Sequence, residues 1–119
     1  MLPINQGDIY WIRPDDENSE LGRHPHPYVV VQDDLFNHSR IHTVVVCALS
    51  TNLGQANQYG NILLDEGEGD LPKQSVVVVS KISSVPKSQL GDFVGRLAPE
   101  RVAQILGGLR LLQKSFQRR

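Results

Sequence analysis

The segment Thr43-Val44-Val45-Val46-Cys47-Ala48-Leu49 decides the fold class, because it is a nearly unbroken apolar run rich in β-branched residues. A run of this kind, without alternating polar residues, is typical of a strand that is buried on both faces. The segment Tyr28-Val29-Val30-Val31-Gln32 has the same character. The two segments therefore predict strands at the centre of a sheet or barrel.

Three further strands are expected around this centre. Ile9–Ile12 is a short apolar run closed by a turn before a proline, and Asn61–Asp65 is a second short run. Gln74–Val85 is longer than most strands, so we expect it to bend near Ser80. Between the two central strands, Asp33–Ser39 has capping residues and room for about one helical turn.

The C-terminal part of the chain changes its periodicity and predicts one long helix. Pro99 suits the first turn of this helix, and Gly107-Gly108 in its middle predicts either close approach to another backbone or a kink. Apolar side chains recur at three- and four-residue steps: Val102, Ile105, Leu106, Leu109, Leu112 and Phe116. The chain is therefore expected to be mainly β with α, forming a small antiparallel β-barrel with a C-terminal helix.

The composition limits where and how the protein acts. A chain of 119 residues with a formal charge of -1 fits one domain and lacks the strong positive field of a non-specific DNA-coating protein. Cys47 is the only cysteine, which excludes an intramolecular disulfide and a multi-cysteine zinc site. The N-terminus has no export signal and no segment approaches a bilayer span, so we expect a cytoplasmic protein without membrane contact.

The segment from Arg13 to Pro27 is expected to be a loop, and two histidines lie near its end. Alternating prolines in Gly22-Arg23-His24-Pro25-His26-Pro27 stiffen the chain, as a catalytic or phosphate-binding loop requires. On the residues alone, a rigid exposed turn with two solvated imidazoles is the more common alternative. Zinc binding is disfavoured because no third ligand follows at a suitable spacing.

Two groups of hydroxyl and basic side chains are further candidates. Ser50-Thr51-Asn52 follows the central strand, where its hydroxyls either donate to a phosphate or simply cap a turn. Lys81 and Lys87 lie with Ser80, Ser83 and Ser84 around the end of the long strand, on either a solvated edge or a phosphate-contacting surface. Cys47 is expected to be a core residue and not a nucleophile, since apolar neighbours raise the pKa of a thiol.

Several motifs together closely resemble the MazF/PemK toxins of bacterial toxin–antitoxin systems. Gly7-Asp8-Ile9-Tyr10-Trp11 opens the resemblance, which continues with His26-Pro27 leading into Val29–Asn37. Later segments extend it through nearly the whole chain: Val44–Asn52, Gly60–Leu64, Leu71–Val77, Val85–Leu90 and Gly95–Leu97.

The resemblance implies one toxin domain over residues 1–119, folded as a small SH3-like barrel that forms a homodimer. It implies cleavage of single-stranded RNA at short preferred sequences, as in mRNA interferases, without a metal or other cofactor. It also implies a cognate antitoxin protein as a partner that blocks the RNA groove.

The sequence departs from the family pattern at two motif positions, and on the late strand Ser80-Lys81 and Ser83-Ser84 stand where many members have Asp-Gln and Arg-Thr features. His26 replaces the arginine that usually precedes the proline, with Arg23 three residues earlier, and Ser50 replaces a threonine. An imidazole exchanges protons near neutral pH, whereas arginine supplies charge, so His26 moves the site toward proton transfer and leaves the cationic role to Arg23 or Lys81. Ser50 keeps the hydroxyl that a threonine would supply.

We therefore expect three catalytic residues, His26, Ser50 and Arg23. The expected RNA contacts are His24, Thr51, Asn52, Lys81 and Lys87.

Two other functions stay open at the level of sequence. The first is a weakened family member that binds antitoxin without cleaving RNA, because the motif arginine is changed. The second is a toxin of the CcdB type, which shares the fold and has a protein as its target.

Overall fold

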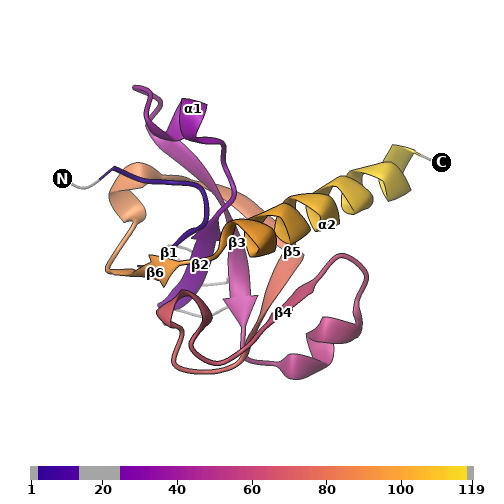
Figure 1. Ribbon diagram of the computed structural model, residues 1–119. Coiled ribbons are helices and arrows are strands. Elements are labelled where there is room, and N and C mark those ends of the chain that lie inside the picture. The colour runs from indigo at the N-terminus through magenta and orange to yellow at the C-terminus, as the bar shows by residue number, and fades with distance from the viewer. Residues whose placement is uncertain (1–2, 14–24, 118–119) are drawn as a thin grey trace.

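The computed structural model describes residues 3–13 and 25–117, and its centre is one curled antiparallel sheet (Figure 1). The six strands lie in the order β4-β5-β3-β2-β1-β6. Their bounds are β1 (Asp8–Ile12), β2 (His26–Val30), β3 (Thr43–Ser50), β4 (Ile62–Leu64), β5 (Ser75–Pro86) and β6 (Phe93–Arg96). The helices are α1 (Asp34–Asn37) and α2 (Pro99–Gln117), with 3-10 turns η1 (Leu53–Asn57), η2 (Glu68–Asp70) and η3 (Lys87–Gln89). The expected small antiparallel barrel with a C-terminal helix is confirmed.

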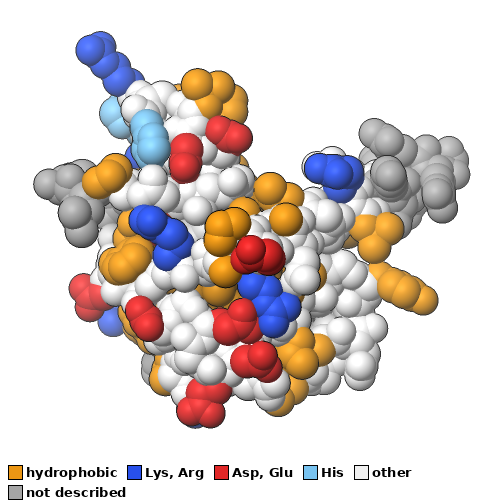
Figure 2. Space-filling view, in the orientation of Figure 1, with side chains coloured by type: hydrophobic (Ala, Val, Ile, Leu, Met, Phe, Trp, Pro, Cys, Tyr) orange, Lys and Arg blue, Asp and Glu red, His pale blue; other side chains and the backbone are white. Residues whose placement is uncertain are grey.

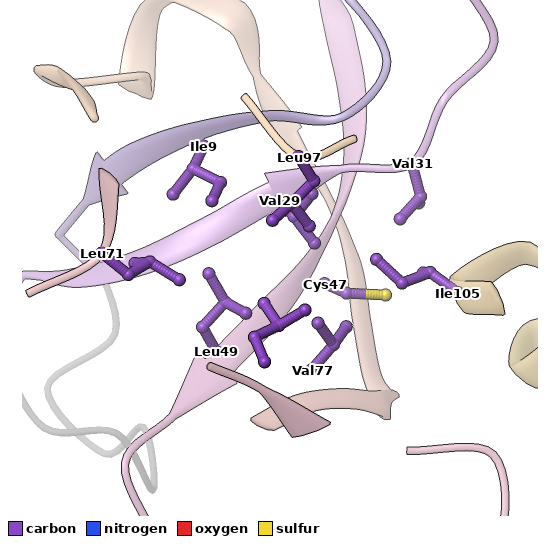
Figure 3. Close-up of a cluster of buried hydrophobic side chains, with 10 residues drawn as sticks. Ile9, Val29, Val31, Cys47, Leu49, Leu71, Val77, Leu97 and Ile105 are labelled. Carbon is purple, nitrogen blue, oxygen red and sulfur yellow. The ribbon is translucent and has the colours of Figure 1, made fainter. Parts of the chain in front are cut away.

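Strand β3 holds the sheet together because both of its faces are buried. Val46, Cys47, Ala48 and Leu49 are each at most 3% exposed. Cys47 and Leu49 belong to a core cluster that α2 closes with Ile105, and Figure 3 shows the Cys47 and Ile105 side chains pointing toward each other. Full burial of one aliphatic side chain stabilises a fold by about 1.5–3 kcal/mol, so this strand is a large contributor to stability.

A second cluster lies on the opposite face of the sheet. Strand β3 contributes Val44, Val46 and Ala48 to this second cluster, and these residues alternate along the strand with those of the first cluster. Strands β1 and β2 add Tyr10, Ile12, Tyr28 and Val30, and Ile4, Val85 and Leu90 pack against them. The continuous apolar run in β3 therefore serves two cores.

Strands β2 and β6 differ most from the sequence-based expectation. Strand β2 begins at His26 and not at Tyr28, because the last two residues of β1 pair with the added residues. Ile12 lies opposite His26, and Trp11 lies opposite Pro27. Pairing with β3 starts only at Tyr28, so the missing N–H of Pro27 interrupts no paired position there. Strand β6 was expected only through the family resemblance, since Phe93–Arg96 has no clear apolar alternation.

The bend expected near Ser80 is a bulge in β5. Val78 lies opposite Ala48 and Ile82 lies opposite Cys47, so Val79, Ser80 and Lys81 have no residue opposite them on β3. Strand β4 covers the other edge of β5 only at Ser75–Val77.

The glycine pair in α2 marks a close backbone approach. A Cβ atom on Gly108 would lie 2.1 Å from the carbonyl oxygen of Gly60, whereas a Cβ atom on Gly107 would meet nothing within 4 Å. Gly60 itself has a φ of +88°. Gly108 therefore allows α2 to dock on the loop before β4, and the C-terminal half of α2 then projects beyond the sheet (Figure 1). None of the helices in the described ranges is long and apolar enough to span a membrane.

The two glycines provide a matched test of this docking. Gly108→Ala should lower the free energy of unfolding by about 1–3 kcal/mol, because the added methyl group meets backbone that has to move. Gly107→Ala should raise it by up to about 1 kcal/mol, since alanine favours the helix and space is open. Urea denaturation of both variants measures the difference, and equal effects would contradict the docking contact.

Candidate functional site

The structure brings two of the three expected catalytic residues to the same end of the sheet. His26 is the half-buried first residue of β2, and Ser50 is the half-buried last residue of β3. Pairing between these strands runs from Val30 opposite Val46 to Tyr28 opposite Ala48. His26 begins β2 two residues before the paired Tyr28, and Ser50 ends β3 two residues after the paired Ala48, so both lie at the same end of these neighbouring strands.

Ser50 is held by its own loop and keeps a hydroxyl hydrogen for another partner. Its Oγ accepts hydrogen bonds from the Asn52 N–H at 3.1 Å and from Gln55 Nε2 at 3.3 Å. Both contacts use the oxygen as an acceptor, and a hydroxyl also carries one donor hydrogen. Ser50 therefore caps a turn, as the simpler interpretation of the sequence held, and its O–H is oriented by contacts that leave it able to donate.

Two residues that the sequence analysis did not single out fix this loop to β5. The Gln55 carbonyl accepts from Asn61 Nδ2 at 3.0 Å, and Asn61 Oδ1 accepts from the Val79 N–H at 3.1 Å. Val79 lies in the bulge, where its N–H has no strand partner on β3. A series of contacts thus connects Ser50 through Gln55 and Asn61 to the segment that carries Lys81. The sequence placed Asn61 at the start of an expected strand and gave no signal for a role of Gln55.

The neighbouring polar residues differ in position. Thr51 is exposed, and Asn52 is the N-cap of η1, where its side chain accepts from the Gly54 N–H at 3.2 Å. Lys81 is half-buried in the β5 bulge beside β3, opposite the Cys47–Ala48 step and about 10 Å along the strand from Ser50 at ~3.4 Å per residue.

Lys87 lies at the other end of β3. Its Nζ donates to the carbonyl oxygens of Asn37 at 3.0 Å and Ser39 at 3.3 Å, which ties η3 to α1. Figure 1 shows α1 at one end of β3 and η1 beyond the other. The structure therefore does not bring Lys87 together with Ser50.

Arg23 and His24, the remaining sequence-predicted residues, lie outside the described residues. The expectation that His26 lies in the loop was wrong, because His26 is paired in β2. In residues 3–13 and 25–117, no three His, Cys, Asp or Glu side chains form a group that could hold a metal ion.

Cys47 takes no part in this site. Burial raises the pKa of its thiol to about 12, and the side chain is 0% exposed in the first core cluster. The thiolate, which is the nucleophile, is therefore almost absent at neutral pH. The expectation that Cys47 is a core residue is confirmed.

Comparison with known proteins identifies the family. Residues 5–113 match the model of the PemK-like, MazF-like toxins of type II toxin–antitoxin systems. The chain belongs to this family. It is 31% identical over 109 residues to endoribonuclease MazF6 of Mycobacterium tuberculosis and to endoribonuclease MazF2 of Mycobacterium bovis, covering 92% of this chain and 96% of each relative.

Solved structures of MazF toxins share the fold. A MazF crystal structure from Deinococcus radiodurans superimposes with a TM-score of 0.76 at 14% identity, covering 96% of this chain and 99% of that chain. A mycobacterial endoribonuclease in complex with its cognate antitoxin gives a TM-score of 0.68 at 20% identity, covering 92% and 91% of the two chains. The curled sheet with its C-terminal helix is thus the MazF fold.

Burial of Cys47 predicts its reactivity in this MazF-family protein. Iodoacetamide at pH 8 should leave the native thiol unmodified and should alkylate it fully after unfolding in urea, because only unfolding exposes the sulfur and lowers its pKa toward the ordinary value. Mass spectrometry of the intact protein measures the product. Rapid modification of the folded protein would show that β3 is accessible.

Proposed function

We propose that this protein is a sequence-selective, metal-independent endoribonuclease toxin that cleaves single-stranded RNA and is neutralised by a cognate antitoxin. The observation that carries the proposal is that β2 begins with the imidazole of His26 where the neighbouring β3 ends with the hydroxyl of Ser50. Family membership and relatives named endoribonucleases support the same activity. The site of action would be the cytoplasm, where RNA and antitoxin are both present.

The chemistry is an attack by the 2′-hydroxyl of RNA on the neighbouring phosphorus. The 2′-oxygen forms a new P–O bond, the bond to the 5′-oxygen breaks, and the products are a 2′,3′-cyclic phosphate and a 5′-hydroxyl. A base has to remove the 2′ proton, an acid has to protonate the departing 5′-oxygen, and donors have to stabilise charge on the phosphate oxygens. No metal is required for any of these steps.

The residues of the site supply these functions. His26 acts as the base that takes the 2′ proton and, once protonated, as the acid that gives a proton to the departing 5′-oxygen. Ser50 donates its hydroxyl hydrogen to a phosphate oxygen, because both contacts that hold its oxygen use it as an acceptor. Lys81, in the bulge beside β3, and Arg23, outside the described residues, add positive charge. Thr51, Asn52 and His24 complete the proposed RNA contacts.

Charge on the visible face is mixed rather than basic. Figure 2 shows Asp and Glu side chains close to Lys and Arg side chains on this face, with no continuous basic stripe. With a net charge of -1, RNA binding has to depend on a local group of cations such as Lys81.

We also propose a homodimer and an antitoxin complex. An interface would bury apolar surface that is exposed in the single chain. This surface includes Leu111 (44% exposed) and Leu112 (42%) in α2 and Ile82 (41%) in β5. The mycobacterial relative solved with its cognate antitoxin supports a protein partner of this kind.

The first test is cleavage of a long mixed-sequence RNA in EDTA. The dimer should give discrete fragments that end in cyclic phosphate or 3′-phosphate, at a rate that added Mg²⁺ or Mn²⁺ leaves unchanged. Electrophoresis with end-group analysis measures the products. Activity that disappears in EDTA and returns with metal would overturn the mechanism. A folded, inactive protein that still binds antitoxin, or that inhibits gyrase as toxins of the CcdB type do, would overturn the enzyme assignment.

The second test separates proton transfer from charge at His26. His26→Ala should lower kcat roughly a hundredfold or more, because general acid–base catalysis usually contributes a rate enhancement of this size. His26→Arg should be equally slow and should change the pH profile of kcat, since arginine keeps charge but does not readily cycle its proton.

Controls are needed because His26 is in a strand. His42, which is exposed, provides the matched variant His42→Ala, and thermal unfolding checks each protein. A fully active His26→Arg variant with an unchanged pH profile would assign His26 to phosphate positioning alone.

A further inference from the structure

A cavity of about 740 Å³ opens on the face of the second core cluster, away from His26 and Ser50. Its floor is formed by β1 and β6, with the N-terminal residues on one side and the segment around η3 on the other. The lining residues used below are Ile4, Asp8, Tyr10, Leu90, Phe93 and Arg96. A volume of this size is typical of pockets that hold a small ligand or one unit of a polymer.

A buried carboxylate fixes a cation at the rim of this cavity. Asp8 is 1% exposed, and its Oδ1 accepts from Arg96 Nε at 2.7 Å. Its Oδ2 accepts from the Asn5 N–H at 2.9 Å and from the Tyr10 hydroxyl at 3.4 Å. The Arg96 side chain nevertheless remains 56% exposed, so much of the guanidinium is accessible to an anion.

An aromatic pair lies next to this cation. The Tyr10 and Phe93 rings meet edge to face, with centroids 5.6 Å apart. Tyr10 is buried, whereas Phe93 is 50% exposed. Phe93 is therefore the ring of the pair that a ligand can reach, and the apolar side chains of Ile4 and Leu90 also line the cavity.

Hydrogen bonds hold both sides of the cavity in place. The Gln6 N–H donates to Asp34 Oδ1 at 2.6 Å, and Gln6 Nε2 donates to the Val31 carbonyl at 2.8 Å, which fix the N-terminal side. On the other side, the Gly91 N–H donates to the Trp11 carbonyl at 2.7 Å. A Cβ atom on Gly91 would lie 2.6 Å from that oxygen, so a glycine is needed for this contact. The cavity is thus formed before any ligand binds.

The cavity shares a face of the sheet with the candidate catalytic residues. Tyr10 and Ile12 lie on the same face of β1, and Ile12 is opposite His26. The two-residue step from Tyr10 to Ile12 covers about 7 Å. The cavity and His26 therefore lie along the same face of β1.

We propose that this cavity is a subsite for one nucleotide that flanks the cleaved bond, with its base against Phe93 and its phosphate on Arg96. The inference rests on the proposed function, because RNA is the ligand. An exposed aromatic ring beside an accessible arginine matches a base joined to a phosphate, and stacking of this kind accepts any base. The preformed walls lower the entropy cost of ordering the nucleotide.

The test measures RNA binding without cleavage. The probe is a fluorescent mixed-sequence 12-mer of 2′-fluoro RNA, which lacks the attacking hydroxyl. Phe93→Leu should weaken its affinity about 5- to 20-fold, because the side chain stays apolar but loses the stacking ring. Phe36→Leu, at a phenylalanine of similar exposure in α1, should change nothing. Arg96→Lys should also weaken binding, and this variant keeps a positive charge beside buried Asp8 so that the fold is preserved.

A second measurement locates the RNA. Ultraviolet cross-linking of a 4-thiouridine version of the same probe, followed by peptide mass spectrometry, should label the segment that contains Phe93 in the original protein and lose that label in Phe93→Leu. Thermal unfolding confirms that each variant is folded.

The outcomes separate this inference from the proposed function. If the protein cleaves RNA but Phe93→Leu binds the probe as tightly as Phe36→Leu does, the subsite is absent and the enzyme assignment stands. If the protein cleaves nothing yet Phe93→Leu weakens binding and loses the cross-link, the cavity binds RNA and the enzyme assignment fails. If Phe93→Leu weakens binding of antitoxin and leaves RNA affinity unchanged, the cavity is a protein contact and the inference is overturned.

Discussion

Burial of β3 on both faces is the constraint on which the rest of this structure depends. One set of alternating side chains, with Cys47 and Leu49, closes a core with α2, and the other set, with Val46 and Ala48, closes a core with β1 and β2. A one-residue slip of β3 would exchange these two sets and disrupt both cores together. The register of β3 is therefore fixed strongly, and with it the position of Ser50 at the strand end.

Much of this arrangement follows from local sequence patterns. Continuous β-branched runs identified β3 and most of β2, and helical periodicity identified α2. The Gly107-Gly108 pair indicated either a close approach or a kink, and Gly108 makes the close approach. These features were predictable because the local spacing of apolar residues indicates which side chains are buried. That spacing does not depend on which element packs against them.

Features that depend on a distant strand were harder to predict. His26 joins β2 because β1 supplies Ile12 opposite it, and a segment with alternating prolines gives no local signal for that pairing. The same holds for Asn61, whose amide oxygen accepts from an N–H that only the bulge in β5 leaves without a partner on β3. Ser50 could be proposed from its place after an apolar run, whereas one of its two acceptor contacts depends on the position of Gln55 in η1.

The ion pair between Asp8 and Arg96 joins residues 88 positions apart in the chain. During synthesis on a ribosome, β1 can pair with β2 early, but its other edge has no partner until β6 has emerged. The carboxylate of Asp8 likewise has no ion-pair partner until Arg96 has emerged. Completion of the sheet is thereby delayed until most of the chain has been made, and α2 follows later still. The nascent chain consequently keeps one edge of β1 unpaired until residues 93–96 have left the ribosome.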